Sequence, residues 1–260
     1  MDFKNILYKK ENRIAYITIN RPEVLNSINP PTSYELYKAW TDFNNDPDTW
    51  VAILTGAGER AFSAGNDLKY SAQYTPSEMA QQMPSTGFGG NTELQCWKPM
   101  IAAVNGFALG GGLEMALACD IIIVAEHAKL GLPEPKVGYV PGAGGMYRLP
   151  RQLGLKTAMG MLLTGRHITA QEAYRIGLVN EVTTLENLMP TAENWAKEIL
   201  ECAPLQIRAI KQSATLGLDA PLETVLRTTF PLLHQAQLSD DWMEGPRAFN
   251  EKRKPNWQGK

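Results

Sequence analysis

Short apolar runs alternate with segments of helical periodicity over about the first 185 residues. Residues 3–19 alternate apolar and polar positions around a turn at residues 10–12, which predicts a pair of neighbouring strands. Continuous apolar runs, typical of strands buried on both faces, follow at residues 51–54 and 100–104, and residues 119–125 are apolar except for Asp120 and are also predicted to form a buried strand. Shorter extended segments are predicted at residues 129–132 and 178–182. Helices are predicted for residues 30–45, 77–83, 113–118, 156–163 and 169–176.

From Leu185 onward the pattern is helical throughout. Pro204, Gly217 and Ser239 separate four helical segments, predicted at residues 188–202, 204–216, 220–236 and 241–253. Alternating strands and helices followed by helices alone predict an α/β core with a helical C-terminal region. We therefore divide the chain into a core, residues 1–185, and a C-terminal region, residues 186–260.

Composition excludes several classes of protein. The chain has 260 residues, 44% of them hydrophobic, which is enough for a sizeable core and argues against disorder. A net charge of −2 generates no general field for polyanions, so nucleic acid is not expected as a partner. No apolar run approaches the roughly 20 residues of a membrane span, so no membrane partner is expected either. Cys96, Cys119 and Cys202 are scattered, which indicates a reducing compartment and a cytoplasmic protein.

Motifs for common cofactors and nucleophiles are absent. No GxGxxG follows a predicted strand, no Walker A sequence is present, and no nucleophile elbow with a paired histidine is found. The cysteines lack the spacing of a zinc or redox site. His127, His167 and His234 are interpreted as structural or surface residues, because no carboxylate lies at ligand spacing from them.

The stretch from Asn105 to Asp120 carries the clearest chemistry. Gly110, Gly111 and Gly112 follow a predicted strand and open a segment of helix-forming residues. Glycines at a helix start leave backbone N–H groups bare, and the helix dipole adds positive potential there. Glu114 lies about one turn after Gly111, so its carboxylate can share a pocket with that N–H group. N–H donors beside a carboxylate suit the stabilisation of an enolate, although a tight turn with a solvated glutamate would have the same pattern.

Two further segments present comparable features. Gly65 and Asn66 lie in a turn of small residues before a predicted helix start, where a second N–H group can point at a ligand. Glu134 lies between Pro133 and Pro135, which stiffen its backbone. Taken alone, the first segment is equally typical of a loop and the second of a surface turn.

Several separated motifs, in order, resemble the crotonase superfamily, the enoyl-CoA hydratase/isomerase family. The resemblance covers essentially the whole chain. Its motifs are Arg21-Pro-x-x-Leu-Asn26, Phe62-Ser-Ala-Gly-Asn-Asp-Leu68, Ala103-Val-Asn-Gly106, Gly110-Gly-Gly-x-Glu114, Cys119-Asp120, Leu132-Pro-Glu134, Gly138-x-x-Pro-Gly-Ala-Gly-Gly145, Arg148-Leu149 and Leu163-Thr-Gly165.

The resemblance implies a spiral of ββα turns with a helical C-terminal trimerisation region. It also implies a homotrimer or a dimer of trimers, acyl-CoA thioester substrates and no metal or redox cofactor, with coenzyme A arriving as part of the substrate. By position, the backbone N–H groups of Asn66 and Gly111 correspond to the family's oxyanion hole. Glu114 and Glu134 match the two carboxylates of hydratases, which predicts that Glu114 deprotonates water and Glu134 protonates C2. Gly142 matches a position whose N–H group helps to hold that water.

Residues for coenzyme A also follow from the resemblance. The matching positions are Val24, Leu25, Ala64, Asp67, Leu68, Phe249 and Lys252, the last two reaching the coenzyme from a neighbouring subunit in some members. Glu23 departs from the family, whose members often carry Lys or Arg there near a phosphate. Lys10 or Lys69 is the predicted substitute.

Residues 71–98 are predicted to form an apolar lid over the acyl group, with core packing as the alternative. The predicted acyl-pocket residues are Tyr70, Met83, Phe88 and Trp97. Motifs at residues 87–93 and 244–259 most resemble the carnitinyl-CoA dehydratase branch of the family. A trimethylammonium substrate needs an aromatic or acidic cage, for which the candidates are Tyr70, Tyr74, Phe88, Glu93 and Trp97.

The sequence thus predicts an enoyl-CoA hydratase/dehydratase, a hydro-lyase acting on the C2–C3 double bond of a thioester. The alternatives on the same fold are a carnitinyl-CoA dehydratase, a hydratase of a cyclic dienoyl-CoA, and an enoyl-CoA isomerase or hydrolase. A non-enzymatic alternative is an RNA-binding or scaffold relative, against which the retained Glu114 and Glu134 argue.

Overall fold

Two β-sheets form the centre of the protein. The computed structural model describes residues 2–260, without the side chain of Pro76, and the sequence-based core therefore begins one residue outside the described part. The six-stranded sheet has the spatial order β1 (Ile6–Glu11), β2 (Ile14–Ile19), β3 (Val51–Gly56), β5 (Met100–Val104), β7 (Ile121–Ala125) and β10 (Glu181–Thr183). The four-stranded sheet has the order β4 (Ala61–Ser63), β6 (Phe107–Leu109), β8 (Lys129–Gly131) and β9 (His167–Thr169).

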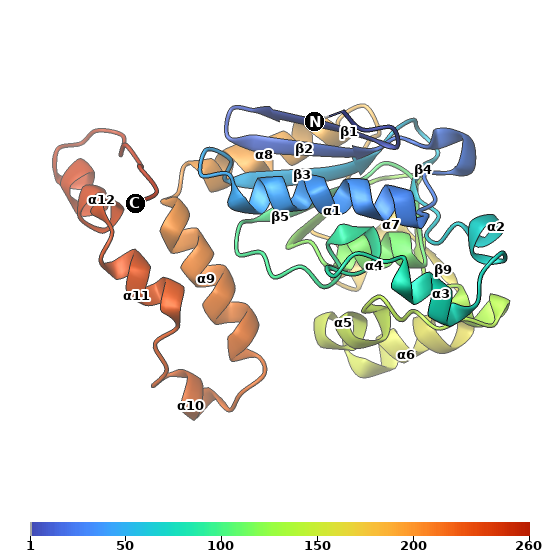
Figure 1. Cartoon of the computed structure of the whole chain (residues 1–260). Coiled ribbons are helices and arrows are strands. Elements are labelled where there is room, and N and C mark those ends of the chain that lie inside the picture. Colours follow the sequence, from blue (N-terminus) through green and yellow to red (C-terminus); the bar gives the residue numbers. More distant parts are fainter. Residues whose placement is uncertain (1) are drawn as a thin grey trace.

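Helices fill the connections and the C-terminal region (Figure 1). The α-helices that follow or cover the sheets are α1 (Pro30–Asn45), α2 (Leu68–Ser71), α3 (Pro76–Gln81), α4 (Gly111–Leu117), α5 (Gly145–Gln152), α6 (Leu155–Thr164), α7 (Ala170–Arg175) and α8 (Leu188–Leu200). The C-terminal helices are α9 (Pro204–Gly217), α10 (Leu222–Val225), α11 (Pro231–Gln237) and α12 (Asp240–Asn250). Short 3₁₀ turns are η1 (Pro22–Val24), η2 (Phe88–Gly90) and η3 (Glu134–Val137).

The chain forms a spiral of repeated ββα turns, as the family resemblance implied. Strands β3, β5 and β7 lie next to one another in the six-stranded sheet, all parallel. Each is followed by a short strand of the second sheet, β4, β6 and β8, which are also parallel neighbours. The helical segments after these short strands therefore begin at the same edge of the second sheet. Because β4, β6 and β8 are parallel, the residues at their carboxyl ends are brought together although they are far apart in the sequence.

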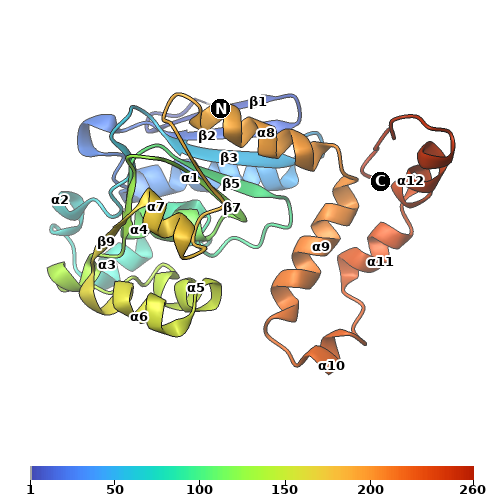
Figure 2. The ribbon, with the colours of Figure 1, turned by 180° about the vertical axis from the view of Figure 1, so that it is seen from behind.

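Helices bury both faces of the six-stranded sheet. Along β3, Ala52 and Leu54 pack in the main core with Trp40 of α1, whereas Val51 and Ile53 face the other side. On that side α8 lies across the back of the sheet, as Figure 2 shows, and contributes Leu188, Ala192 and Ala196. A strand that is buried on both faces has no polar alternation, which explains the continuous apolar run at this strand.

The C-terminal helices stand clear of the two sheets (Figure 1). They are α9 to α12, beginning at Pro204, whereas α8 packs against the six-stranded sheet. The single helix predicted for residues 220–236 is wrong: it is two helices, α10 and α11, with Pro231 opening the second. None of the helices in the described range combines the length and the apolar character needed to cross a bilayer.

One helix was not predicted. The sequence analysis predicted no element for residues 145–152, but α5 begins at Gly145 and continues past Pro150. Pro150 lies six residues into an eight-residue helix. The predicted strand 178–182 is also shorter, since β10 starts at Glu181.

Candidate active site

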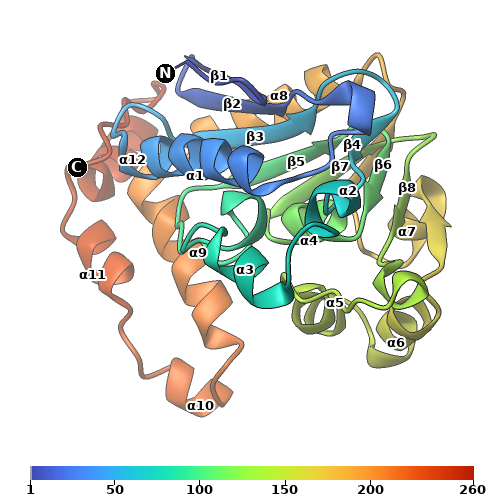
Figure 3. The ribbon, with the colours of Figure 1, turned by 45° about the vertical axis from the view of Figure 1, so that its right-hand side comes forward.

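A cavity of about 730 Å³ opens at the edge where the ββα turns meet. Figure 3 shows α2, α3 and α4, which contribute to its lining, near one another. The cavity lies between α2 and α3 on one side and the segment 133–143 on the other, with the start of α4 as its floor. Its walls are mainly apolar. The lining residues are Ala64, Asn66, Leu68, Ser71, Tyr74, Met79, Ala80, Met83, Phe88, Leu109, Gly110, Gly111, Glu114, Pro133, Glu134, Lys136, Val137, Tyr139, Val140, Gly142, Ala143 and His167.

Two backbone N–H groups meet at the floor of this cavity. Gly65 has φ +85°, and a Cβ atom on it would lie 2.6 Å from the Leu109 carbonyl oxygen and 2.9 Å from the Gly111 nitrogen. Glycine is therefore required for the Asn66 turn to approach the start of α4 this closely. Within the described residues, neither the Asn66 N–H nor the Gly111 N–H donates a hydrogen bond. Both groups remain available to a ligand oxygen.

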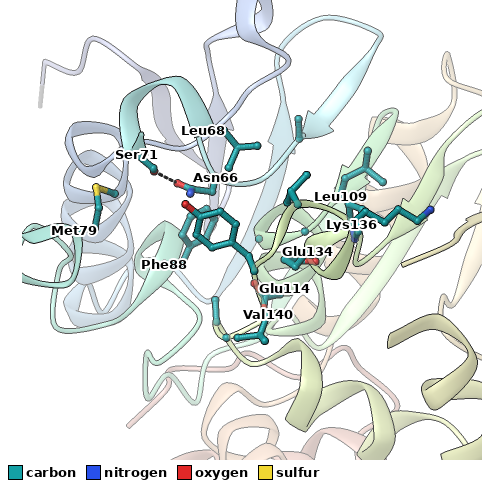
Figure 4. Close-up of a pocket in the computed structure, with 18 of the residues that line it drawn as sticks. Asn66, Leu68, Ser71, Met79, Phe88, Leu109, Glu114, Glu134, Lys136 and Val140 are labelled. Carbon is teal, nitrogen blue, oxygen red and sulfur yellow. Dashed lines mark hydrogen bonds between the residues drawn. The ribbon is translucent and has the colours of Figure 1, made fainter. Parts of the chain in front are cut away.

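The side chain of Asn66 is occupied elsewhere. Its Oδ1 accepts a hydrogen bond of 2.9 Å from the Ser71 hydroxyl, as Figure 4 shows. Ser71 ends α2, so this bond turns the amide side chain toward the helix and leaves the backbone N–H at the floor. A residue with a different side chain would present the same N–H group, because the donor is part of the main chain.

Two buried asparagines hold the loop that carries Asn66. The Asn26 side chain donates to the carbonyl oxygens of Ala57 and Ala61 at 2.9 and 2.7 Å. The Asn105 side chain donates to Gly58 and to the same Ala61 carbonyl at 2.7 and 3.2 Å. Buried carbonyls need such partners. These asparagines, two of the motif residues that carried the family resemblance, are thus part of the scaffold.

Glu114 projects from the first turn of α4 and is 3% exposed. Its Oε1 accepts a 2.8 Å hydrogen bond from the Gly145 N–H, and the Ala143 N–H also donates to this carboxylate. Burial raises the pKa of Glu114 to about 7, the N–H donors oppose this shift, and the charge of Glu134 adds to it. A carboxyl group with this pKa can accept a proton near neutral pH and release it again.

Glu134 faces the same cavity from η3 (Figure 4). Its Oε2 is buried and has no hydrogen-bond partner among the described residues. Burial raises the pKa of this carboxyl group as well. Its Oε1 lies 2.9 Å from where a Cβ on Gly110 would be, so the absence of a side chain at Gly110 leaves room for the carboxyl group. An unsatisfied buried oxygen is costly unless a ligand completes it.

Arg148 supports the loop that holds Glu114. Its guanidinium donates to the carbonyl oxygens of Ala143 and Thr92, the former at 3.4 Å and the latter at 2.5 Å. Its positive charge also lowers the pKa of Glu114. The sequence analysis noted Arg148 only as part of a motif. Arg148 thus connects Thr92 to the loop whose N–H groups bind the Glu114 carboxylate.

The N–H group of Gly142, which was expected to help hold the water molecule, is used within the chain. The Gly142 N–H donates to the Val140 carbonyl oxygen at 2.8 Å, closing a three-residue turn around Pro141. Gly142 does line the cavity, but its N–H group is not free to hold a water molecule. The loop N–H groups that point at Glu114 belong to Ala143 and Gly145 instead.

Some of the residues expected to contact coenzyme A lie at the cavity, and others do not. Ala64 and Leu68 line the cavity, and the Ala64 N–H donates to the Leu25 carbonyl, which places Leu25 beside them. Asp67 forms a 3.1 Å ion pair with Arg21 and caps α2, so its side chain is engaged within the chain. The neighbouring Val24, in η1, is exposed and does not line the cavity.

Three other residues expected near coenzyme A lie away from the cavity. Lys10 forms ion pairs of 2.7 Å with Asp42 and Asp46, so it does not replace the missing phosphate contact at Glu23. Phe249 is 84% exposed on α12, and Lys252 follows that helix. Figure 1 shows α12 on the opposite side of the molecule from α2 and α3. Within one chain these two residues do not join the cavity.

Of the predicted acyl-pocket residues, Met83 and Phe88 line the cavity and Tyr70 and Trp97 do not. Tyr70 donates a hydrogen bond to Gln82 and its ring packs on Tyr74, which takes its place in the wall. Trp97, between the buried Cys96 and Lys98, is half-buried outside the cavity. Glu93, a cage candidate, is also outside the lining.

The sequence analysis missed the far wall of the cavity. This wall comes from η3, the segment after it and β9, and it includes His167, which had been interpreted as structural or as a surface residue. Its members are Lys136, Val137, Tyr139, Val140, Ala143 and His167. The proline and glycine content of residues 133–145 marked a loop but carried no signal for the strand pairing that brings His167 there.

The cavity combines an acid–base pair with two N–H donors in an apolar surrounding. Two carboxyl groups with raised pKa values can hold different protonation states, one accepting and one donating a proton. The paired N–H groups can stabilise an oxygen that becomes negative during the reaction. No cluster of three or more metal-ligating side chains is present in residues 2–260.

Comparisons with known proteins agree with this geometry. The enoyl-CoA hydratase/isomerase family profile matches residues 9–260. The chain is 44% identical over 248 residues to (E)-benzylidenesuccinyl-CoA hydratase of Thauera aromatica, covering 95% of this chain and 96% of that protein. It is 43% identical over 256 residues to a carnitinyl-CoA dehydratase of Salmonella enteritidis, covering 95% of each chain. The crystal structure of an enoyl-CoA hydratase from Mycobacterium tuberculosis superposes with a TM-score of 0.92 at 37% identity, covering 98% and 99% of the two chains.

Proposed function

The chain belongs to the enoyl-CoA hydratase/isomerase family, and on that premise we propose that it adds water reversibly across the C2–C3 double bond of an enoyl-CoA thioester. The observation that carries this proposal is that Glu114 and Glu134 face one apolar cavity beside two unused backbone N–H groups. A single carboxyl group is enough to move a proton between carbons. Two are needed to activate water and protonate carbon in the same turnover.

The thioester carbonyl oxygen is held by the N–H groups of Asn66 and Gly111. As hydroxide bonds to C3, the double-bond electrons shift to C2 and the carbonyl, and the oxygen becomes negative. Each N–H donor in a comparable site contributes about 3–4 kcal/mol to this stabilisation. The positive end of α4 adds to it, because Gly111 is the first residue of that helix.

The two glutamates have opposite tasks. Ionised Glu114 accepts a proton from water while the water oxygen bonds to C3, and protonated Glu134 delivers a proton to C2. The reverse sequence removes water from the 3-hydroxyacyl thioester. The N–H groups of Gly145 and Ala143 hold the Glu114 carboxylate in place, whereas the free Oε2 of Glu134 is directed at substrate. Atoms and protons balance without any electron transfer, so the proposed reaction needs neither a metal nor a redox cofactor.

Coenzyme A is proposed to lie along Leu25, Ala64 and Leu68, with its thioester at the cavity floor. Phe249 and Lys252 would then reach it from another copy of the chain, in a trimer or a dimer of trimers. The exposed apolar side chains of the C-terminal helices, such as Leu218, Leu226 and Phe249, support such an assembly. Sedimentation equilibrium should give the mass of three or six chains, and a monomer would contradict the proposal.

A cytoplasmic location is proposed on the cysteines. Cys96, Cys119 and Cys202 are all free thiols, and the first two are buried. Free buried thiols are typical of a reducing compartment.

The direct test follows the enoyl absorbance of crotonyl-CoA after purified protein is added. A rapid loss, with 3-hydroxybutyryl-CoA as the product, is expected. Release of free coenzyme A would indicate a thioester hydrolase, and migration of the double bond in a 3-enoyl-CoA without water addition would indicate an isomerase. Either of these results without hydration of any 2-enoyl-CoA would contradict the proposal.

A further inference from the structure

The cavity has a cationic end that the proposed hydration reaction does not use. Among its described lining residues the only acids are Glu114 and Glu134, and the remaining charged or titratable side chains, tyrosines aside, are Lys136 and His167. Figure 4 shows Lys136 extending past Leu109, with Met79 at the opposite side of the view and the two glutamates between them. The cavity is thus apolar at one end and cationic at the other.

Local packing sets Lys136 and His167 side by side. The Cε atom of Lys136 lies 3.4 Å from where a Cβ on Gly165 would be, so its stem crosses the turn that leads into β9. His167 opens β9 and pairs with Gly131 of β8, and its Cδ2 would lie 2.9 Å from a Cβ on Gly131. A side chain at Gly131 would displace the imidazole. Glycine at position 131 therefore leaves room for the imidazole at this wall, while the Lys136 stem passes Gly165 at an ordinary contact distance.

Neither side chain has a hydrogen-bond or ion-pair partner among residues 2–260. The backbone N–H of Lys136 donates to the Pro133 carbonyl, but its Nζ and the His167 ring nitrogens form no hydrogen bond or ion pair in that range. Burial lowers the pKa of His167, and the nearby positive charge of Lys136 lowers it further. Two groups that oppose each other's charge are stabilised together by an anion that accepts hydrogen bonds from both.

We propose that Lys136 and His167 form a subsite for an anionic group, a carboxylate or a phosphate, carried by the thioester substrate. This inference rests on the proposed function, because it assumes a thioester with its carbonyl at Asn66 and Gly111. Lys136 follows Glu134 by two residues in η3, and both side chains line the cavity that holds the acyl group in the proposed reaction. A carboxylate on the acyl group therefore shares a cavity with Lys136, whereas the phosphates of coenzyme A are separated from the thioester by the whole pantetheine arm.

With this subsite, the affinity for a thioester depends on the charge of its acyl group. A negatively charged acyl group gains hydrogen bonds from the Lys136 ammonium and the His167 ring. A neutral acyl group gains none, and a quaternary ammonium meets like charge instead of the acidic cage that the sequence analysis considered. Of the cage candidates, Tyr70, Glu93 and Trp97 lie outside this cavity, so the rings of Tyr74 and Phe88 are the ones left to face a cationic acyl group.

The test measures binding of saturated esters, so it does not depend on turnover. Isothermal titration calorimetry gives the Kd of glutaryl-CoA, butyryl-CoA and butyryl-pantetheine for wild type, Lys136→Met and His167→Gln. Methionine keeps the apolar stem of the lysine and removes its charge. Lys156→Met, at an exposed position of α6 outside the cavity, is the matched control. A failure of the hydration assay leaves this measurement intact.

Each pattern of Kd values has one meaning. If the anion is an acyl carboxylate, Lys136→Met weakens glutaryl-CoA about tenfold more than butyryl-CoA, as expected for the loss of one charge-assisted hydrogen bond. If it is a phosphate of coenzyme A, both CoA esters weaken about tenfold relative to butyryl-pantetheine. Equal changes for all three esters, or no change beyond that of Lys156→Met, would overturn the subsite. His167→Gln should follow the same pattern with a smaller ratio.

Discussion

Replacement of Glu134 by glutamine is expected to lower kcat for the hydration of crotonyl-CoA by about 10²–10⁴-fold, the range typical of a lost general acid. Glutamine has nearly the same shape but no proton to deliver to C2. The Oε2 atom of Glu134 has no hydrogen-bond partner within residues 2–260, so the substitution disturbs no hydrogen bond of that oxygen there. The measurement is stopped-flow absorbance at saturating substrate.

Binding and fold provide the controls for Glu134→Gln. The Kd for butyryl-CoA should stay within about threefold of wild type, because the N–H donors and the cavity walls are untouched. Glu126→Gln, at an exposed position between β7 and β8, should keep full activity. Undiminished hydration by Glu134→Gln would remove Glu134 from the reaction and leave Glu114 as the sole acid–base group.

Replacement of Glu114 by glutamine should lower kcat/KM by a similar factor, about 10²–10⁴-fold, and remove one limb of the pH profile. In wild type the base must be ionised, and the pKa of Glu114 is raised to about 7. The rate should therefore fall about tenfold per pH unit below pH 7. The acid, Glu134, must be protonated, so the rate should fall again above its own raised pKa.

The same variant makes a prediction about stability. The pKa of Glu114 is about 7 in the folded chain and ordinary, 4.5, in the unfolded chain, so the folded state binds the proton more tightly. Its favourable contribution is complete below about pH 4.5 and is lost as the pH rises through 7. Glutamine cannot ionise and can still accept the Gly145 hydrogen bond. Glu114→Gln should therefore be more stable than wild type at pH 8, by up to about 3 kcal/mol.

Thermal unfolding at pH 4.5 and pH 8 checks this sign. The gain in Tm of Glu114→Gln over wild type should be several degrees at pH 8 and close to zero at pH 4.5. A variant that is less stable than wild type at pH 8 would show that the ionised carboxylate is held favourably. In that case the base would have an ordinary or lowered pKa, and the acid limb of the rate profile would lie well below pH 7.

Much of the fold followed from local pattern. The apolar runs at β3, β5 and β7 are buried on both faces, and the alternation at β1 and β2 corresponds to an antiparallel pair. The helix from Pro30 to Asn45 has the predicted bounds, with Asn29 capping it and two prolines in its first turn. The helix α5 was not predicted, because glycine and proline give its segment a weak helix preference that tertiary contacts outweigh.

The candidate site divides in the same way. Gly65, Gly110 and the glutamate one turn after Gly111 could be selected from sequence because they imply particular backbone angles and a particular helix face. The roles first expected for Gly142 and Trp97 do not fit their positions, since the one uses its N–H within a turn and the other lies outside the cavity. Such outcomes depend on hydrogen bonds and side-chain directions that residue type alone does not specify.

By itself, the sequence determined which segments are buried, which turns require glycine and which side chains are candidates for acid–base chemistry, because these depend on residues close together in the chain. The tertiary structure alone decided that Glu114 binds the N–H group of Gly145, that α8 belongs to the core and that Lys136 meets His167 at a cavity wall. Each of these contacts joins segments whose separation is set by strand register and helix packing. A shift of register by one residue would separate them, and no local pattern encodes that register.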